Sequence, residues 1–167
     1  MKLWSVLLVC FFPLALLADS EQMFDGFDSA HDACYAYSYG YKGVEKDYNK
    51  AFKWCGIGHE IEENNSSTTL LAELYFFGYG VKKDLDMAVR LYAQAALSGH
   101  EHAAVMVYYV IHLEAPEQFN PKQKEFAFKL LTVAAKLGNE KAQALLEQHK
   151  NRQSEEQTGT SQQSKVI

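Results

Sequence analysis

The chain has 167 residues, of which 48% are hydrophobic, 22% charged and 13% aromatic, and its net charge is −5. This length allows one domain with a modest core, and the apolar content excludes a chain that is disordered throughout. The acidic balance and the lack of a basic run argue against a nucleic-acid partner, because phosphate groups are bound mainly by Lys and Arg.

The beginning of the chain has the composition of a signal peptide. Lys2 precedes a largely apolar stretch from Leu3 to Leu17, and small or polar residues follow. A membrane anchor is the alternative, but the stretch is shorter than the roughly 20 residues that cross a bilayer, and Pro13 interrupts it. We therefore predict cleavage after Ala18 or Ser20, a periplasmic or secreted protein, and no membrane contact after cleavage.

After a short lead-in, residues 19–28, apolar residues recur at helical spacing, with no alternating strand pattern of useful length. Helix starts are indicated by Asp47, Asp84 and Asn120, which are spaced 37 and 36 residues apart. Glycines that end alanine-rich helices are spaced 39 residues apart, which indicates an internal repeat. They are Gly99 and Gly138. The expected helices cover residues 29–40, 48–60, 67–78, 85–97, 101–114, 121–137 and 140–150.

One unit of this repeat carries a specific motif. Residues 74–84 read Leu-Tyr-Phe-Phe-Gly-Tyr-Gly-Val-Lys-Lys-Asp, and Ala88, Tyr92, Ala95-Ala96 and Gly99 follow. This unit resembles the Sel1-like repeat family, a tetratricopeptide-like family, at nearly every position of its pattern. The resemblance implies an all-α fold: a short right-handed α-solenoid of about three helix-turn-helix repeats plus a C-terminal capping helix.

The flanking units are less regular copies. The first has Tyr41 where a repeat glycine belongs, and the third replaces the Gly-Val motif with Pro116 and Asn120-Pro121. The polar end of the chain has no apolar period, so we expect it to be disordered. The expected boundaries are a signal peptide over 1–18, a repeat domain over 29–150 with repeats 29–61, 67–99 and 101–138 and a cap 139–150, and a disordered tail over 151–167.

Two cysteines remain after removal of a leader that contains Cys10. Cys34 lies nine residues before Gly43, and Cys55 lies eight residues after Asp47, so antiparallel helices place them at the same height. An oxidising compartment favours paired thiols, and facing side chains at that height meet the separation that a disulfide requires. We predict a Cys34–Cys55 disulfide.

Other sites of chemistry are weakly indicated. Two buried free thiols, or a structural zinc site completed by His31 and His59, are the alternatives to the disulfide. The segment His100-Glu101-His102 lacks the spacing of a zinc protease, and no Ser is followed three residues later by Lys, as in serine β-lactamases. We predict no enzyme activity, no cofactor and no metal.

Tyr35, Tyr39, Phe76 and Tyr79 are the candidate binding residues, because the first helix of each solenoid pair lines the concave face; the alternative is that the rings pack between repeats. We predict a non-catalytic module that is exported and binds an unidentified protein or peptide, for example as an immunity or adaptor protein. Cysteine-rich relatives suggest a periplasmic hydrolase that binds β-lactams or cell-wall ligands instead. A third option is a eukaryotic secretory lumen, since the segment 64–67, Asn-Asn-Ser-Ser, contains glycosylation acceptors.

Overall fold

The computed structural model describes the backbone of residues 26–163 and the side chains of residues 26–154. The predicted signal peptide lies outside the described residues. Within them the chain forms seven α-helices and no strand. The helices are α2 (Ala30–Tyr39), α3 (Tyr48–Glu60), α4 (Asn65–Phe77), α5 (Leu85–Leu97), α6 (Glu101–Tyr109), α7 (Pro121–Lys136) and α8 (Glu140–Gln163).

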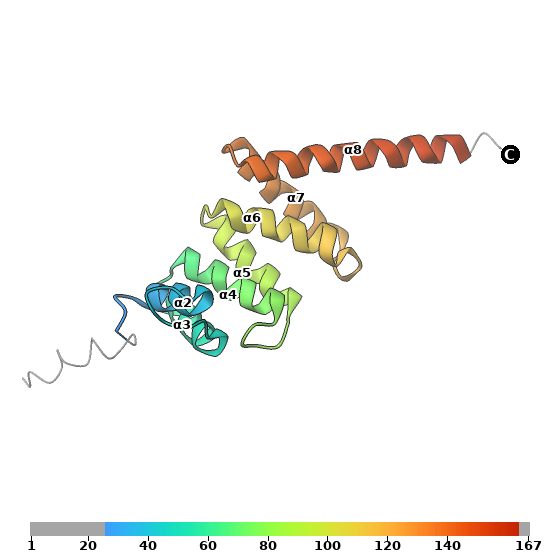
Figure 1. Ribbon diagram of the computed structural model, residues 1–167. Coiled ribbons are helices and arrows are strands. Elements are labelled where there is room, and N and C mark those ends of the chain that lie inside the picture. Colours follow the sequence, from blue (N-terminus) through green and yellow to red (C-terminus); the bar gives the residue numbers. More distant parts are fainter. Residues whose placement is uncertain (1–25, 164–167) are drawn as a thin grey trace, which may run out of the picture.

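The helices are stacked in chain order, with α2 and α3 at one end and α8 at the other (Figure 1). Each helix packs against the next one along the chain, and α2 also contacts α4, the first helix of the following pair. The pairs are therefore α2 with α3, α4 with α5, and α6 with α7. This arrangement confirms the predicted all-α solenoid, and no helix within residues 26–163 has the length and apolar character that crossing a membrane requires.

Side chains at the predicted start signals cap the second helix of each pair. Asp47 accepts hydrogen bonds from the backbone N–H groups of Asn49 and Lys50, and Asp84 accepts one from Met87. Asn120 forms a capping box with Gln123. These caps satisfy backbone donors that a helix leaves unpaired in its first turn, which is why the starts could be read from the sequence.

The core is built from small residues where helices approach closely and from large rings between them. Ala33, Ala51, Ala72 and Ala103 are completely buried, as is Tyr92 on α5. A second, smaller core lies between α6, α7 and α8, with Leu131 at its centre. Full burial of a leucine side chain stabilises a fold by about 1.5–3 kcal/mol. From α8, Ala142 is buried in this core, and Leu145 and Leu146 pack against it.

The expected helix over 101–114 changes its form near its end. After Tyr109 the chain continues as a π-helical turn, Val110–Glu114, and then as a short 3-10 helix, Pro116–Gln118. Pro116 explains why the helix stops, because the residue before a proline is driven out of the α-helical region. The wider turn contains His112, which hydrogen bonds through Nε2 to the carbonyl of Lys124 on α7 at 2.9 Å.

The tail that we expect to be disordered from residue 151 lies within α8 as far as Gln163. The segment contains no proline, and a helix already nucleated by packing can extend through polar residues at little cost. Two contacts also support its first turn. Arg152 donates a hydrogen bond to the Tyr108 hydroxyl at 3.1 Å, and the Ser154 hydroxyl donates to the carbonyl of Asn151 at 2.7 Å.

Candidate binding groove

A hollow with a cavity volume of about 340 Å³ lies on the face formed by the first helices of the three pairs. We call it the tyrosine–histidine groove. Its lining consists of His31, Tyr35 and Tyr39 from α2, Ser66, Thr69, Leu70 and Glu73 from α4, and His100 and His102 at the start of α6.

Helical periodicity explains why these side chains share one face. His31, Tyr35 and Tyr39 are four residues apart on α2, and residues at that spacing lie one above another on a helix. Thr69 and Glu73 have the same spacing on α4. Contact between α2 and α4 brings the two rows together, so the groove depends on how the first and second repeats pack.

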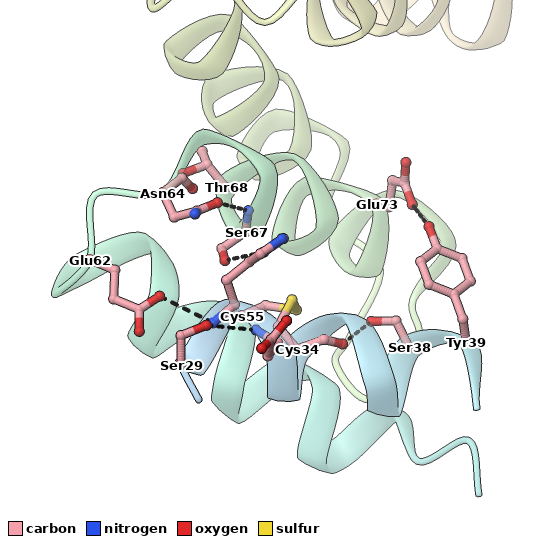
Figure 2. The surroundings of a disulfide bond; sticks show 12 residues. Ser29, Cys34, Ser38, Tyr39, Cys55, Glu62, Asn64, Ser67, Thr68 and Glu73 are labelled. Carbon is pink, nitrogen blue, oxygen red and sulfur yellow. Dashed lines mark hydrogen bonds between the residues drawn. A yellow bond between two sulfur atoms is a disulfide. The ribbon is translucent and has the colours of Figure 1, made fainter. Parts of the chain in front are cut away.

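Glu73 is the acidic centre of the groove. The Tyr39 hydroxyl donates a hydrogen bond to its Oε2 at 3.3 Å (Figure 2), and Nε2 of His102 lies 3.6 Å from its Oε1. The Glu73 side chain is 26% exposed. Burial of the phenol, together with the nearby charge of Glu73, raises the pKa of Tyr39 to about 12, so this tyrosine stays protonated and keeps its donor.

The other histidines of the groove hydrogen bond to hydroxyl groups of α4. Nδ1 of His31 lies 3.1 Å from the Ser67 hydroxyl, and Nδ1 of His100 lies 3.3 Å from the Thr69 hydroxyl. Burial is the main cause that lowers the pKa of His100, and the neighbouring His102 adds to it, whereas Glu73 acts in the opposite direction. His100 is therefore neutral over a wider pH range than an ordinary histidine.

Glu73 also lines a second hollow, of about 130 Å³, which shares Tyr39 and Leu70 with the first. Aromatic rings dominate this end. Tyr79 stacks on Tyr48 with ring centroids 4.3 Å apart and on Phe77 at 5.2 Å. Glu73 thus lies between two groups of partly exposed rings.

Three of the four predicted binding residues are exposed on this face: Tyr35, Tyr39 and Tyr79. Phe76 is not; it is only 6% exposed and belongs to the core, whereas Phe77 beside it is 52% exposed. Successive residues of a helix point about 100° apart, so only one of two adjacent phenylalanines can face the groove. The ring of Phe76 instead lies 6.2 Å from that of Tyr109 on α6.

The predicted disulfide is present between Cys34 of α2 and Cys55 of α3 (Figure 2). Both cysteines are completely buried, and their Cα atoms lie 4.7 Å apart. The two sulfur atoms are bonded to each other, so in this state they are neither free thiols nor thiolate ligands. His59, proposed as a zinc ligand, hydrogen bonds through Nδ1 to the Thr68 hydroxyl at 2.9 Å.

Sequence reasoning missed the residues that complete this region. Glu73 and His102 enter the groove from different helices, and no local motif marks either of them. Glu62, in the connection between α3 and α4, accepts hydrogen bonds from the backbone N–H groups of Ala30 and His31 at 2.7 and 3.1 Å. A carboxylate at the start of α2 is favourable because unpaired backbone N–H groups point toward it. Glu62 lies about 30 residues after these N–H groups in the chain, so no local sequence pattern indicates the contact.

Comparisons with known proteins point to one family. A family model described as Sel1 repeat matches residues 28–56, 66–100 and 120–139, together half of the chain. A crystal structure of a Sel1 repeat protein from Oxalobacter formigenes is similar, with 26% sequence identity and a TM-score of 0.57 over 75% of this chain and 48% of that one. The chain thus spans about half the length of that protein. No curated protein matches the sequence.

Proposed function

Because this chain belongs to the Sel1 repeat family, whose repeats are generally protein–protein interaction modules, we propose that it is an exported, non-catalytic binding protein. Its partner is a protein or a peptide segment that occupies the tyrosine–histidine groove. The groove lies on the first helices of the pairs, which form the concave face in helical solenoids.

The observation that carries this proposal is the group of exposed rings around Glu73. Tyr35, Tyr39, Phe77 and Tyr79 all remain exposed although each adjoins a hollow on the first-helix face. Tyrosine is common at binding hot spots, because its ring contributes a large apolar area and its hydroxyl a hydrogen bond. Burial of these rings by a partner gives a physical reason for their exposure.

Export is supported by two observations of different kinds. The first residues of the chain have the composition of a signal peptide, and Cys34 and Cys55 form a disulfide, which persists in oxidising compartments. A binding protein in the periplasm or outside the cell fits an immunity or adaptor role. A toxin gene beside the gene for this chain would favour the immunity role.

The test is capture of the partner by wild-type protein and by variants. Protein purified from its native compartment without reductant is cross-linked, and the attached proteins are identified by mass spectrometry. The double variant Tyr39→Ala/Tyr79→Ala should lose the main partner, because it removes one ring from the groove and one from the second hollow. Phe126→Ala is the matched control, since Phe126 is a partly exposed ring of α7 that lines neither hollow.

The proposal fails if the captured proteins are the same for wild type and the double variant, or if Phe126→Ala removes them equally. The hydrolase alternative is tested with the same preparation and a chromogenic cephalosporin. Turnover of that substrate would replace the binding proposal.

A further inference from the structure

The charge of the groove is set by one carboxylate. Among the nine residues that line the 340 Å³ hollow, Glu73 is the only carboxylate and none is Lys or Arg. The second hollow differs, because it includes Lys46, whose Nζ lies over the ring of Tyr48 at 5.6 Å from the centroid. The α6 side of the groove is therefore acidic at neutral pH, and the other side carries a positive charge of its own.

The contacts that Glu73 makes within the protein leave capacity for a cation. Tyr39 is a neutral donor at 3.3 Å, and His102 at 3.6 Å lies beyond the 2.7–3.2 Å that is typical of a nitrogen-to-oxygen hydrogen bond. Burial of about three-quarters of the Glu73 side chain weakens its hydration. A charge-assisted hydrogen bond from a cation is stronger than either present contact.

The rings beside Glu73 suit the same cation. Tyr35 and Tyr39 are exposed, and their ring centroids lie 4.8 Å apart at an interplanar angle of 52°. A cation within about 6 Å of such a ring is attracted by the electron density of its face. Elsewhere in the protein Nζ of Lys53 lies over the ring of Trp54 at 4.5 Å, a contact of the same kind.

We propose that the tyrosine–histidine groove receives a lysine or arginine side chain of the partner, held by the Glu73 carboxylate and the rings of Tyr35 and Tyr39. The inference rests on the proposed function and names its partner chemistry as a basic peptide segment. Lys46 repels a second cation at the opposite end, so the basic side chain enters on the side of α6.

The experiment begins with selection of a random dodecapeptide phage library on the full wild-type protein at pH 7.5. Enriched peptides are synthesised with fluorescein, and their Kd is measured by fluorescence anisotropy. Each basic residue is then replaced by its neutral counterpart, citrulline for Arg or norleucine for Lys. We expect enrichment of basic residues, and at one position a loss of affinity of about tenfold or more, the size of one charge-assisted hydrogen bond.

Variants of the protein locate the site of that loss. Glu73→Gln should weaken binding of the basic peptide by about the same factor. This variant should bind the basic and the neutral peptide with equal affinity, which would show that Glu73 and the basic side chain of the peptide interact. Phe126→Ala should behave as wild type throughout.

The outcomes separate this inference from the proposed function. If the enriched peptides lack basic residues but lose affinity with Tyr39→Ala, the inference is overturned and the binding proposal stands. If no peptide is enriched, or if Tyr35→Ala and Tyr39→Ala leave the affinity unchanged, both proposals fail. The peptide substitutions leave the protein unaltered, so the inference can be refuted even if a Glu73 variant does not fold.

Discussion

Within residues 26–163, α2 and α3 form the first pair of the stack, and the Cys34–Cys55 disulfide joins them. At the other end α8 packs on α7 without a covalent bond. There the buried Tyr108 ring stacks on His112 at 4.4 Å, and its hydroxyl forms hydrogen bonds with Nδ1 of His149 at 2.8 Å and with Arg152 at 3.1 Å. The first and last helices of the described stack are therefore held by different kinds of interaction.

The disulfide and the Tyr108 cluster act on different states of the chain, the unfolded and the folded state. A disulfide stabilises mainly by restricting the unfolded chain, so it depends on redox conditions and little on pH. The cluster at the C-terminal end acts through contacts in the folded state, and it includes His112, whose pKa is lowered by burial, so its contribution depends on pH. Stability in a solenoid is approximately a sum over repeats and their interfaces, and each end can therefore be weakened by itself.

Loss of the disulfide should have the largest effect. Reduction of the Cys34–Cys55 bond, which closes a loop of 21 residues, should lower the free energy of unfolding by about 3 kcal/mol. Urea unfolding of the wild-type protein with and without reductant measures this, and the variant Cys34→Ala/Cys55→Ala should not respond to reductant. Hydrogen exchange should increase in α2 and α3 first; an equal increase in α7 and α8 would contradict the separation of the two ends.

The second largest loss of stability should come from changes at the interface between the first two repeats. Gly80 has φ +67°, and a side chain there would overlap the backbone carbonyl of Tyr48 in α3. Gly43 occupies the same repeat position with φ +81°, but nothing lies within 4 Å of the place where its Cβ would be. Both Ala variants carry backbone strain, and only Gly80→Ala must also displace a neighbour.

We expect Gly80→Ala to lower the free energy of unfolding by about 2–3 kcal/mol and Gly43→Ala by about 1 kcal/mol. Thermal unfolding followed by circular dichroism compares them. Equal losses would mean that backbone strain alone determines the loss of stability. The close packing of Gly80 against the Tyr48 backbone would then not stabilise the first repeat.

At the C-terminal end, Tyr108→Phe should remove the hydroxyl shared by His149 and Arg152 while keeping the buried ring. We expect a loss of about 1 kcal/mol, the usual contribution of a hydrogen bond of this kind. Tyr109→Phe is the matched control, because Tyr109 is the adjacent tyrosine and is partly exposed. Denaturant unfolding measures both variants. If Tyr109→Phe lowers the free energy of unfolding as much as Tyr108→Phe does, the hydrogen bonds of Tyr108 do not contribute more than those of an ordinary tyrosine.

The smallest effect is the dependence of stability on pH. Burial lowers the pKa of His112, and the charges of Lys124 and Arg152 act in the same direction, whereas the hydrogen bond to the Lys124 carbonyl opposes them. Between the ordinary histidine pKa of about 6.5 and the lowered value, the unfolded chain binds a proton that the folded protein does not. The contribution of His112 is therefore complete above that range and decreases as the pH falls.

We expect a loss of less than about 1 kcal/mol between pH 7.5 and 5.5, because His112 is partly exposed to solvent. His112→Gln should reduce the dependence of the free energy of unfolding on pH. Part of the dependence should remain, because the pKa of His100 is also lowered. Unfolding free energies measured at several pH values test it. A slope of opposite sign would show that the folded state prefers the charged imidazole.

Local patterns predicted a large share of the fold. The caps at Asp47, Asp84 and Asn120 act over two or three residues, so their sequence signals needed no knowledge of the rest of the chain. The extension of α8 past residue 150 did not follow from the pattern, because no apolar period marks it. Contacts such as Arg152 with Tyr108 became visible only when α8 lay against α6.

Sequence patterns were sufficient to predict the helix starts, their repeat and the disulfide, because each depends on neighbours along the chain or on one antiparallel pair whose spacing can be counted. The tertiary structure decided which rings face outward, as with Phe76 and Phe77, and it assembled Tyr39, Glu73 and His102 from three helices into one groove. Helical periodicity defines the faces of each helix, but which face is buried depends on how repeats pack, and that information lies in contacts between residues far apart in the chain.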